Sequence, residues 1–277
     1  MNIGTHLSIG KGYPNLVKDA LSINSNTFQI FLGNPRNRRN QKIDENQLIE
    51  LNQLLKQHQF APVLIHSPYI MNPCSPKPEV IELSLEIFKE DLRLMEFIPH
   101  NYYNLHPGSR LKTPLEPATR QIADFLNQVL TPEQSTVVLL ETMSGKGSEV
   151  GRNFDELKLI LDQVQLQDKV GICFDLCHLF DSGYDVKEHF HEVLKEFDEK
   201  IGLHKCKAFH INDSKNELGS HRDRHACMNE GNIGLDVIRQ ILSHPYCSQL
   251  PLILETPTDL IGHKKEVQLI QSLKEEL

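Results

Sequence analysis

Six short apolar runs in this chain each end at a residue whose side chain can bind a metal ion. The terminal residues lie between 34 and 45 positions apart, and they are His66, His106, Glu141, Asp175, His210 and Glu255. Imidazole nitrogens and carboxylate oxygens are ligands of zinc, and ions in a cluster share bridging carboxylates. The spacing therefore predicts one pocket, ringed by His, Asp and Glu, to which several strands contribute a ligand.

Three further candidate ligands lie in predicted loops. His178 follows Asp175 by three positions, and Asp223 lies two positions before His225. Residues at i and i+2 of an extended segment face the same way, so Asp223 and His225 could bind one ion. A single His at a strand end is more often a hydrogen-bonded structural residue. Six strand ends in succession favour the metal site over that alternative.

Eight strands are needed to position these residues, and eight apolar or β-branched runs supply them. They cover residues 2–6, 27–31, 63–66, 103–106, 138–141, 172–175, 208–210 and 252–255. Helical periodicity occupies the segments between and after them, near 13–23, 46–58, 77–98, 116–130, 153–165, 186–199, 234–243 and 263–276. Eightfold strand–helix alternation predicts a (β/α)8 barrel, an α/β fold whose active site lies at the C-terminal ends of the strands. The rival, an open doubly wound sheet, usually has a Gly-rich first turn, and Gly-x-Gly-x-x-Gly is absent after the first strand.

Size and composition fit one barrel domain over residues 1–277. The chain is 39% hydrophobic and 24% charged, with no apolar run near the roughly 18 residues that span a bilayer. We expect no signal peptide, and the six cysteines form no Cys-x-x-Cys pair, which favours reduced thiols in the cytoplasm. The net charge of −8 argues mildly against a polyanionic partner, but bound divalent ions are not counted in it.

Local motifs extend the argument along almost the whole chain. They are IGTHLS at 3–8, NLHPGS at 104–109, LETMSGKGS at 140–148, FDLCH at 174–178, HINDSK at 210–215, DRH at 223–225 and LILET at 252–256. In this order they resemble the endonuclease IV family of zinc-dependent apurinic/apyrimidinic endonucleases. That family has a (β/α)8 barrel with three zinc ions, one of which another divalent ion can replace.

The resemblance implies a role for each candidate ligand. His66, His106 and Glu141 would hold the first ion, and Glu141 would bridge to a second bound by Asp175, His210 and Glu255. The third would be bound by His178, Asp223 and His225. A hydroxide shared by the first two ions would attack the phosphorus. Three Zn²⁺ against four carboxylates leave a net charge of about +1 even with the hydroxide, so bound metal would let an otherwise acidic pocket attract phosphate. Asp213 could orient a ligand from outside the metal shell, or be an ordinary turn residue.

Loops at the predicted barrel mouth carry the expected DNA contacts. Arg36, Arg38 and Arg39 follow the second strand, and charge alone fits a solvated face as well as a phosphate contact. By resemblance, Arg36 penetrates the base stack, while Tyr69 and Ile70 wedge the gap left by an extruded abasic nucleotide. Two departures from the family pattern stand out. Many relatives have Trp where Arg38 stands, and Gly is common where Asn229 stands, although Asn tolerates a positive φ.

The sequence thus predicts a monomeric hydrolase of DNA repair that acts in the cytoplasm, associated with the nucleoid, and has no membrane partner. Its expected reaction cuts double-stranded DNA 5′ to an abasic site and leaves a 3′-hydroxyl and a 5′-deoxyribose phosphate. Removal of blocked 3′ ends is a second expected activity. The rival function is a metal-dependent sugar isomerase or epimerase of the xylose-isomerase-like barrels. That rival would use Glu141, Asp175, His210 and Glu255 and leave the other five candidate ligands unexplained.

Overall fold

Eight parallel strands form the centre of the protein. The computed structural model describes residues 1–37 and 42–277, so Arg38 and Arg39 lie outside the described residues. The strands adjoin in the order β1-β10-β7-β6-β5-β4-β3-β2. Their bounds are β1 Asn2–Thr5, β2 Gln29–Ile30, β3 Leu64–His66, β4 Tyr102–Leu105, β5 Val137–Glu141, β6 Val170–Asp175, β7 Cys206–His210 and β10 Pro251–Leu254.

The two edge strands of this sheet, β1 and β2, meet and close it into a barrel. His6 forms a parallel bridge with Gln29, and the backbone N–H of Leu7 donates to the carbonyl of Gln29 at 2.8 Å. Gly4 permits this close approach, because a Cβ at that position would lie 2.0 Å from the carbonyl oxygen of Thr27. The predicted (β/α)8 barrel is therefore confirmed.

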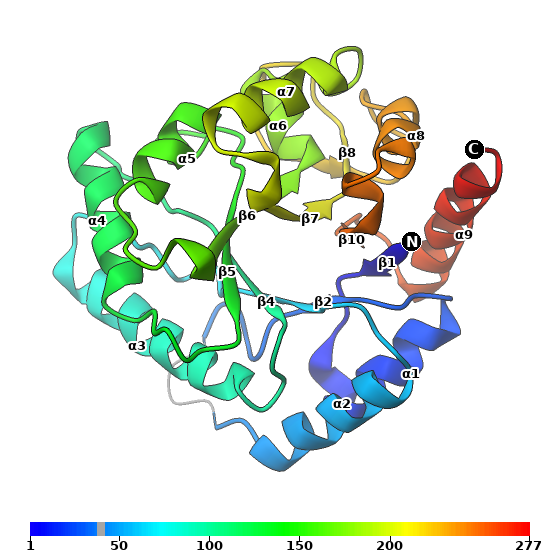
Figure 1. The fold of residues 1–277 in the computed structure, drawn as a ribbon, viewed down its shortest axis with the longest axis horizontal. Coiled ribbons are helices and arrows are strands. Elements are labelled where there is room, and N and C mark those ends of the chain that lie inside the picture. The colour runs from blue at the N-terminus through cyan, green and yellow to red at the C-terminus, as the bar shows by residue number, and fades with distance from the viewer. Residues whose placement is uncertain (38–41) are drawn as a thin grey trace.

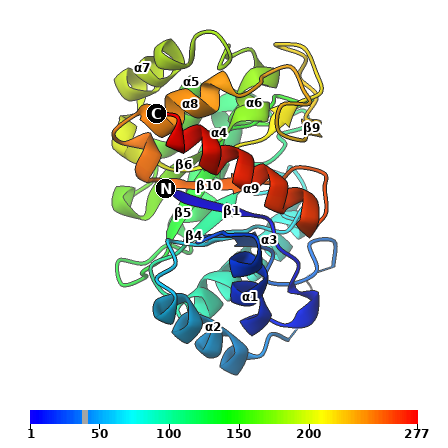
Figure 2. The ribbon, with the colours of Figure 1, turned by 90° about the vertical axis from the view of Figure 1, so that its right-hand side faces the viewer.

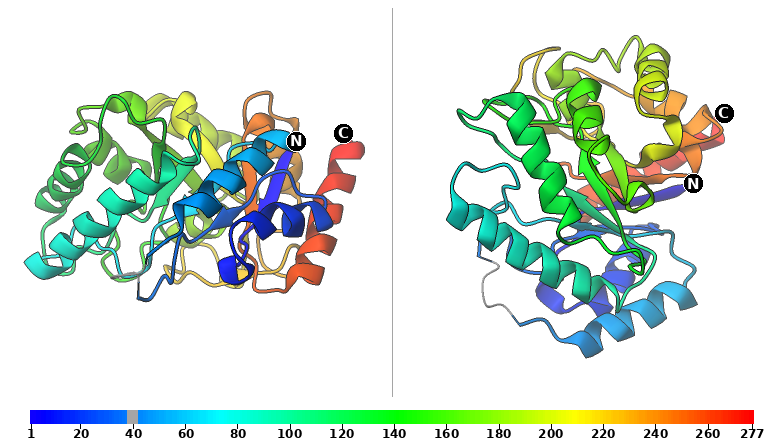
Figure 3. Two further views of the ribbon diagram at one scale, coloured as in Figure 1. Left: turned by 90° about the horizontal axis from the view of Figure 1, so that it is seen from below. Right: turned by 60° about the vertical axis from the view of Figure 1, so that its left-hand side comes forward.

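Helices surround the strands on the outside of the barrel (Figure 1), as two further views also show (Figure 3). They are α1 Pro14–Ser22, α2 Glu45–Gln57, α3 Pro78–Met95, α4 Leu115–Asn127, α5 Phe154–Leu161, α6 Leu176–Ser182, α7 Phe190–Lys200, α8 Asp236–Ser243 and α9 Leu260–Glu275. Short 3-10 helices cover Ile9–Lys11, Gln167–Lys169, Leu203–Lys205 and Cys247–Gln249. Asn153 caps α5, since its side chain accepts a hydrogen bond from the N–H of Glu156. In Figure 2, β1 and β10 run side by side next to α9.

Side-chain alternation along the strands divides the apolar residues into two cores. One fills the barrel and consists of Leu64, Leu139, Cys173, Ala208 and Ile253, all fully buried. The other lies between the sheet and the helices and includes the outward-facing Ile65, Leu140, Phe174, Phe209 and Leu254. Because neighbouring side chains on a strand point to opposite faces, the residue after each outward-facing one points inward again.

One helix and one two-stranded hairpin near the barrel mouth were not predicted. Helix α6 follows β6 directly, and β8 (Asp213–Ser214) pairs antiparallel with β9 (His225–Ala226) outside the barrel sheet. Both are short, and their sequences lack the long periodicity by which the outer helices were predicted. Within residues 1–37 and 42–277, every helix is too short or too polar to cross a membrane.

Candidate metal centre

The alternation of the strands brings the predicted ligands to one end of the barrel. On five strands, the residue two positions after a member of the inner core is a candidate ligand; these ligands are His66, Glu141, Asp175, His210 and Glu255. All five therefore point inward at the C-terminal ends of the strands, one layer above the apolar core that fills the barrel. Parallel strands share that end, so residues far apart in sequence converge there.

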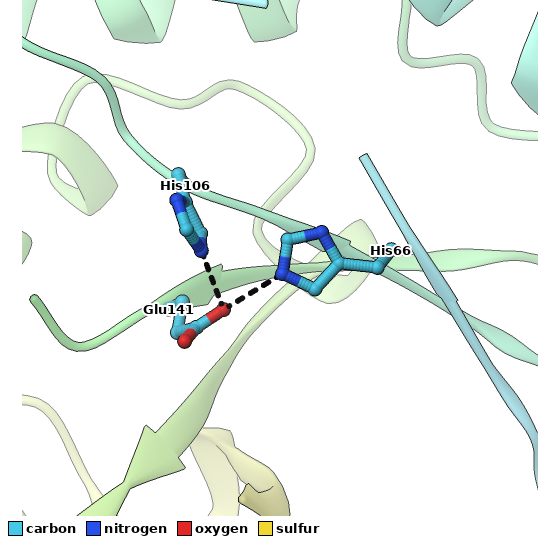
Figure 4. A group of neighbouring side chains, drawn as sticks. All are labelled: His66, His106 and Glu141. Atoms are coloured by element: carbon cyan, nitrogen blue, oxygen red, sulfur yellow. Dashed lines mark ion pairs between the residues drawn. The ribbon is translucent and has the colours of Figure 1, made fainter. Parts of the chain in front are cut away.

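The first group of side chains joins β3, β4 and β5. The Nε2 atoms of His66 and His106 lie 3.4 and 3.2 Å from Oε2 of Glu141. Figure 4 shows both rings directed at this one oxygen. Asn104, on β4, donates a hydrogen bond to the same oxygen. The three ligand atoms lie close enough together to hold one ion.

The second group also includes Glu141 and is the most buried. Nδ1 of His210 lies 3.1 Å from Oε2 of Glu255, 3.3 Å from Oε1 of Glu141 and 3.6 Å from Oδ2 of Asp175. His210 and Asp175 are fully buried. Glu141 thus offers one carboxylate oxygen to each of two adjacent groups, which is the arrangement of a bridging ligand.

The third group comes from the unpredicted elements. His178 lies in the first turn of α6 and not in a loop, because Asp175 caps that helix by accepting from the N–H of His178 at 2.8 Å. Nε2 of His178 lies 3.3 Å from Oδ1 of Asp223, and Nε2 of His225 lies 3.6 Å from the same oxygen. The prediction that an extended segment turns Asp223 and His225 to the same side is wrong, because Asp223 has φ of 83°. The β8–β9 turn brings the two together instead.

The histidine tautomers show why these groups suit a cation. The Nδ1 atoms of His66 and His178 lie 2.8 and 2.9 Å from the backbone carbonyls of Ser67 and Thr142, and Nδ1 of His225 lies 3.3 Å from that of Glu255. A carbonyl can only accept, so each Nδ1 carries the proton and each Nε2 presents a lone pair to the carboxylates. Lone pairs facing carboxylate oxygens repel one another unless a cation lies between them.

Unsatisfied buried atoms support the same reading. Within the described residues, Oε1 of Glu141, Nδ1 of His210 and Nε2 of His225 are buried without a hydrogen-bond partner. Such orphaned atoms are costly, and all three belong to the second and third groups. The nine side chains therefore fit metal ions, with a donor set of imidazole and carboxylate that is characteristic of zinc. Cys177, not singled out from the sequence, also lies within ligand range of Asp175 and His225.

Protons on two of the histidines can supply positive charge to the centre in place of metal. Burial lowers the pKa of His178 and of His210, but nearby carboxylates outweigh it and raise both pKa values well above the ordinary one. Burial likewise raises the pKa of Glu141, whereas His106 and His210 outweigh it and hold this pKa well below the usual range. The centre therefore demands positive charge, which protons or metal ions can supply.

Several side chains that fix the ligands were missed by sequence reasoning. Asn104 contacts Glu141, and Asn212 donates to Oδ2 of Asp175 at 2.9 Å while accepting from the N–H of Glu255. Gln29, on β2, contacts both His210 and Glu255. Asn212 follows the ligand His210 by two positions, and this spacing was the available signal.

Asp213 holds a turn and contacts none of the nine ligands through a hydrogen bond in the described part of the chain. Its carboxylate accepts from the N–H groups of Ser214, Ile233, Gly231 and Gly234. Asn229, in the same loop, has φ of 64°, a positive value that Asn tolerates better than most residues.

The residues expected to touch DNA lie beside the centre. Tyr69 follows β3, is 63% exposed, and its ring lies 5.1 Å from that of Phe31 and 6.2 Å from that of His66. Ile70 is half-buried and packs against the outer core, and Arg36 is exposed. Partial shielding of its hydroxyl from water, together with Glu255 and Glu141, raises the pKa of Tyr69, so its phenol stays protonated and can donate. Both Tyr69 and Arg36 thus expose their side chains.

Comparisons with known proteins agree with this geometry. Residues 17–276 match the family model described as "Xylose isomerase-like TIM barrel". A protein of Alkaliphilus oremlandii named "Probable endonuclease 4" is 49% identical over 271 residues, covering 98% of this chain and 96% of the relative. A protein of Clostridium beijerinckii with the same name is 48% identical over 273 residues, covering 99% of each chain. The crystal structure of endonuclease IV from Thermus thermophilus superimposes with a TM-score of 0.89 at 28% identity and covers all of both chains.

Proposed function

The chain belongs to the endonuclease IV family of xylose isomerase-like TIM barrels and is a nuclease. From this premise we propose that it cuts duplex DNA 5′ to an abasic site and leaves a 3′-hydroxyl and a 5′-deoxyribose phosphate. We also propose that it removes blocking groups from 3′ ends. Both reactions break a phosphate ester at a lesion, so one centre can serve both.

The observation that carries the proposal is the set of three adjacent ligand groups, two of which share Glu141. We propose that His66, His106 and Glu141 hold one zinc ion, that Glu141, Asp175, His210 and Glu255 hold a second, and that His178, Asp223 and His225 hold a third. Bound zinc polarises phosphoryl oxygens and lowers the pKa of bound water towards about 7, which permits ester hydrolysis at neutral pH. A separate general base is then unnecessary.

The protein's own residues contribute placement and charge. Four carboxylates converge with five imidazoles on one pocket, so the phosphate of a substrate meets this pocket favourably only when cations fill it. Tyr69, exposed and protonated, can enter the gap at a missing base and donate to a phosphate oxygen. Arg36 adds an exposed cation on the neighbouring loop, where, as in the family that the chain resembles, it would enter the base stack beside the lesion.

The rival reading, a metal-dependent sugar isomerase or epimerase, explains the second group alone. It gives no role to His66 and His106, which are both directed at Glu141, or to the third group built on α6 and β9. It also requires one or two divalent ions, whereas the proposal requires three. Zinc content per folded chain therefore separates the two readings.

The test uses zinc-loaded protein and an end-labelled duplex with one tetrahydrofuran residue, an abasic analogue that cannot undergo β-elimination. We expect one cut 5′ to the analogue and extension of the nick by a DNA polymerase, which needs a free 3′-hydroxyl. Size-exclusion chromatography with light scattering should show a monomer bound to one duplex. No cut by protein that retains its zinc would overturn the proposal, and a panel of free sugars would then test the rival.

A further inference from the structure

Gln29 is a fully buried amide on β2 whose side chain reaches three others at the barrel mouth. Its Oε1 lies 2.8 Å from Nε2 of His210, and its Nε2 lies 2.5 Å from Oε1 of Glu255. The same Nε2 lies 3.1 Å from Nδ1 of His6. One side chain thus contacts two proposed ligands of the second ion and a neighbouring histidine.

These contacts permit one assignment of donors and acceptors. The Glu255 carboxylate can only accept, so the amide NH2 of Gln29 must face it, and the amide oxygen must face His210. An amide oxygen can only accept, so Nε2 of His210 must carry a proton and donate it. Nδ1 of His210 then has no proton in the neutral ring and presents its lone pair to Glu141, Asp175 and Glu255. The second amide hydrogen is directed to Nδ1 of His6, which accepts it.

Dependence on a side chain sets His210 apart from three of the other four histidines of the centre. His66, His178 and His225 have their non-ligating nitrogen against a backbone carbonyl, which no substitution removes. His210 would ligate through Nδ1, the opposite nitrogen, and its Nε2 is directed to Gln29. Neutral imidazole in water favours neither site strongly enough to fix the ring, so the partner decides.

We propose that Gln29 is a positioning residue for the second metal ion: it fixes the His210 tautomer that exposes Nδ1 and holds the Glu255 carboxylate beside it. The inference rests on the proposed metal centre. Without the amide, the His210 ring can rotate or exchange its proton, and Oε1 of Glu255 loses its donor. Gln29 has no contact with the ligands of the third ion in the described structure, so that ion should be unaffected.

The test compares Gln29→Met, which keeps the length and shape of the side chain but removes both polar atoms, with wild type. Gln134→Met is the matched control, because Gln134 is also a buried amide, 8% exposed, but bonds Thr131 and Thr136 away from the metal centre. Zinc affinities come from competition with a chromophoric chelator, zinc content from elemental analysis, and the His210 tautomer from ¹⁵N NMR of labelled protein. Circular dichroism establishes that each variant is folded.

We expect Gln29→Met to bind one of its three zinc ions about 10–100-fold more weakly, the range for loss of a group that orients a ligand. The signal of the His210 Nε2–H should shift because it loses its acceptor, and Gln134→Met should leave both readouts unchanged. Gln29→Glu keeps an acceptor for His210 but sets a carboxylate against Glu255, so it should preserve the tautomer and still weaken the ion.

Each failure has a distinct meaning. A Gln29→Met variant with three ions of wild-type affinity and unchanged His210 signals would overturn the role of Gln29 and leave the metal centre intact. If Gln29→Met does not fold, Gln29→Glu decides by the same two readouts. Wild-type protein that binds no zinc would overturn the proposed function itself.

Discussion

Replacement of Glu141 by Gln is the most informative single substitution, because its carboxylate belongs to two ligand groups at once. The change preserves shape and removes one negative charge and one acceptor. Oε2 lies 3.4 and 3.2 Å from His66 and His106, and Oε1 lies 3.3 Å from His210. A unit charge pair at such a distance is worth about 5 kcal/mol at an effective dielectric constant near 20. At 1.36 kcal/mol per factor of ten, ion binding should weaken roughly 10³–10⁴-fold.

The assay measures incision of the tetrahydrofuran duplex and zinc content on the same samples. We expect Glu141→Gln to retain its fold, to lose zinc from the first and second groups, and to cut at least about 10³-fold more slowly. Glu96→Gln makes the same chemical change at the opposite end of the barrel, where Glu96 accepts from the N–H of Ser135, and should behave as wild type. Normal turnover by Glu141→Gln would refute the shared-ligand reasoning, and so would normal zinc content.

Three further predictions follow from other parts of the centre. Arg36→Ala and Tyr69→Ala should each weaken binding of abasic duplex about tenfold more than binding of intact duplex, about 1.4 kcal/mol by fluorescence anisotropy; equal losses on both duplexes would leave only general attraction for phosphate. Because the pKa values of His178 and His210 are raised, their protonated forms stabilise the metal-free fold fully below about pH 6.5, and this stabilisation is lost as pH rises through the raised values. Zinc must displace those protons, so its affinity should fall about tenfold per pH unit for each displaced proton as pH decreases, and a flat titration profile would contradict this. Asp181 accepts hydrogen bonds from Ser214, Asn216 and the N–H of Asp223. Asp181→Ala leaves these three donors without their acceptor, at a cost of about 1–3 kcal/mol each, and should therefore release the third zinc ion first. The control Asp162→Ala removes an exposed acid next to α5 and should keep all three zinc ions.

The repeated pattern of the strands made most of the barrel and its mouth predictable. Apolar runs ending in His66, Glu141 or Asp175 recur at one strand–helix interval, and parallel strands expose their C-terminal ends on one side. Strand geometry then fixes direction, since a ligand two positions after an inward apolar residue must itself point inward. Both relations are local and periodic, so they can be read from the order of residues.

The third group depended more on tertiary structure. Its ligands come from α6 and from the β8–β9 hairpin, elements too short to show a period, and Asp223 reaches the site with φ of 83°. The motifs at 174–178 and 223–225 suggested these residues by resemblance, but the packing of the hairpin against α6 brings Nε2 of His178 and of His225 within 3.3 and 3.6 Å of Oδ1 of Asp223. No rule of sequence spacing gives that distance.

The role of Gln29 was decided by tertiary structure alone. Gln29 lies 181 positions from His210 and 226 from Glu255, and within its own strand it is one polar residue among apolar neighbours. A buried amide acquires meaning only from the donors and acceptors that folding places around it, because its own chemistry allows either role. The sequence by itself determined which side chains could bind metal. Closure of the barrel between β1 and β2 determined how His210 and Glu255 are oriented, because it brings Gln29 to both of them.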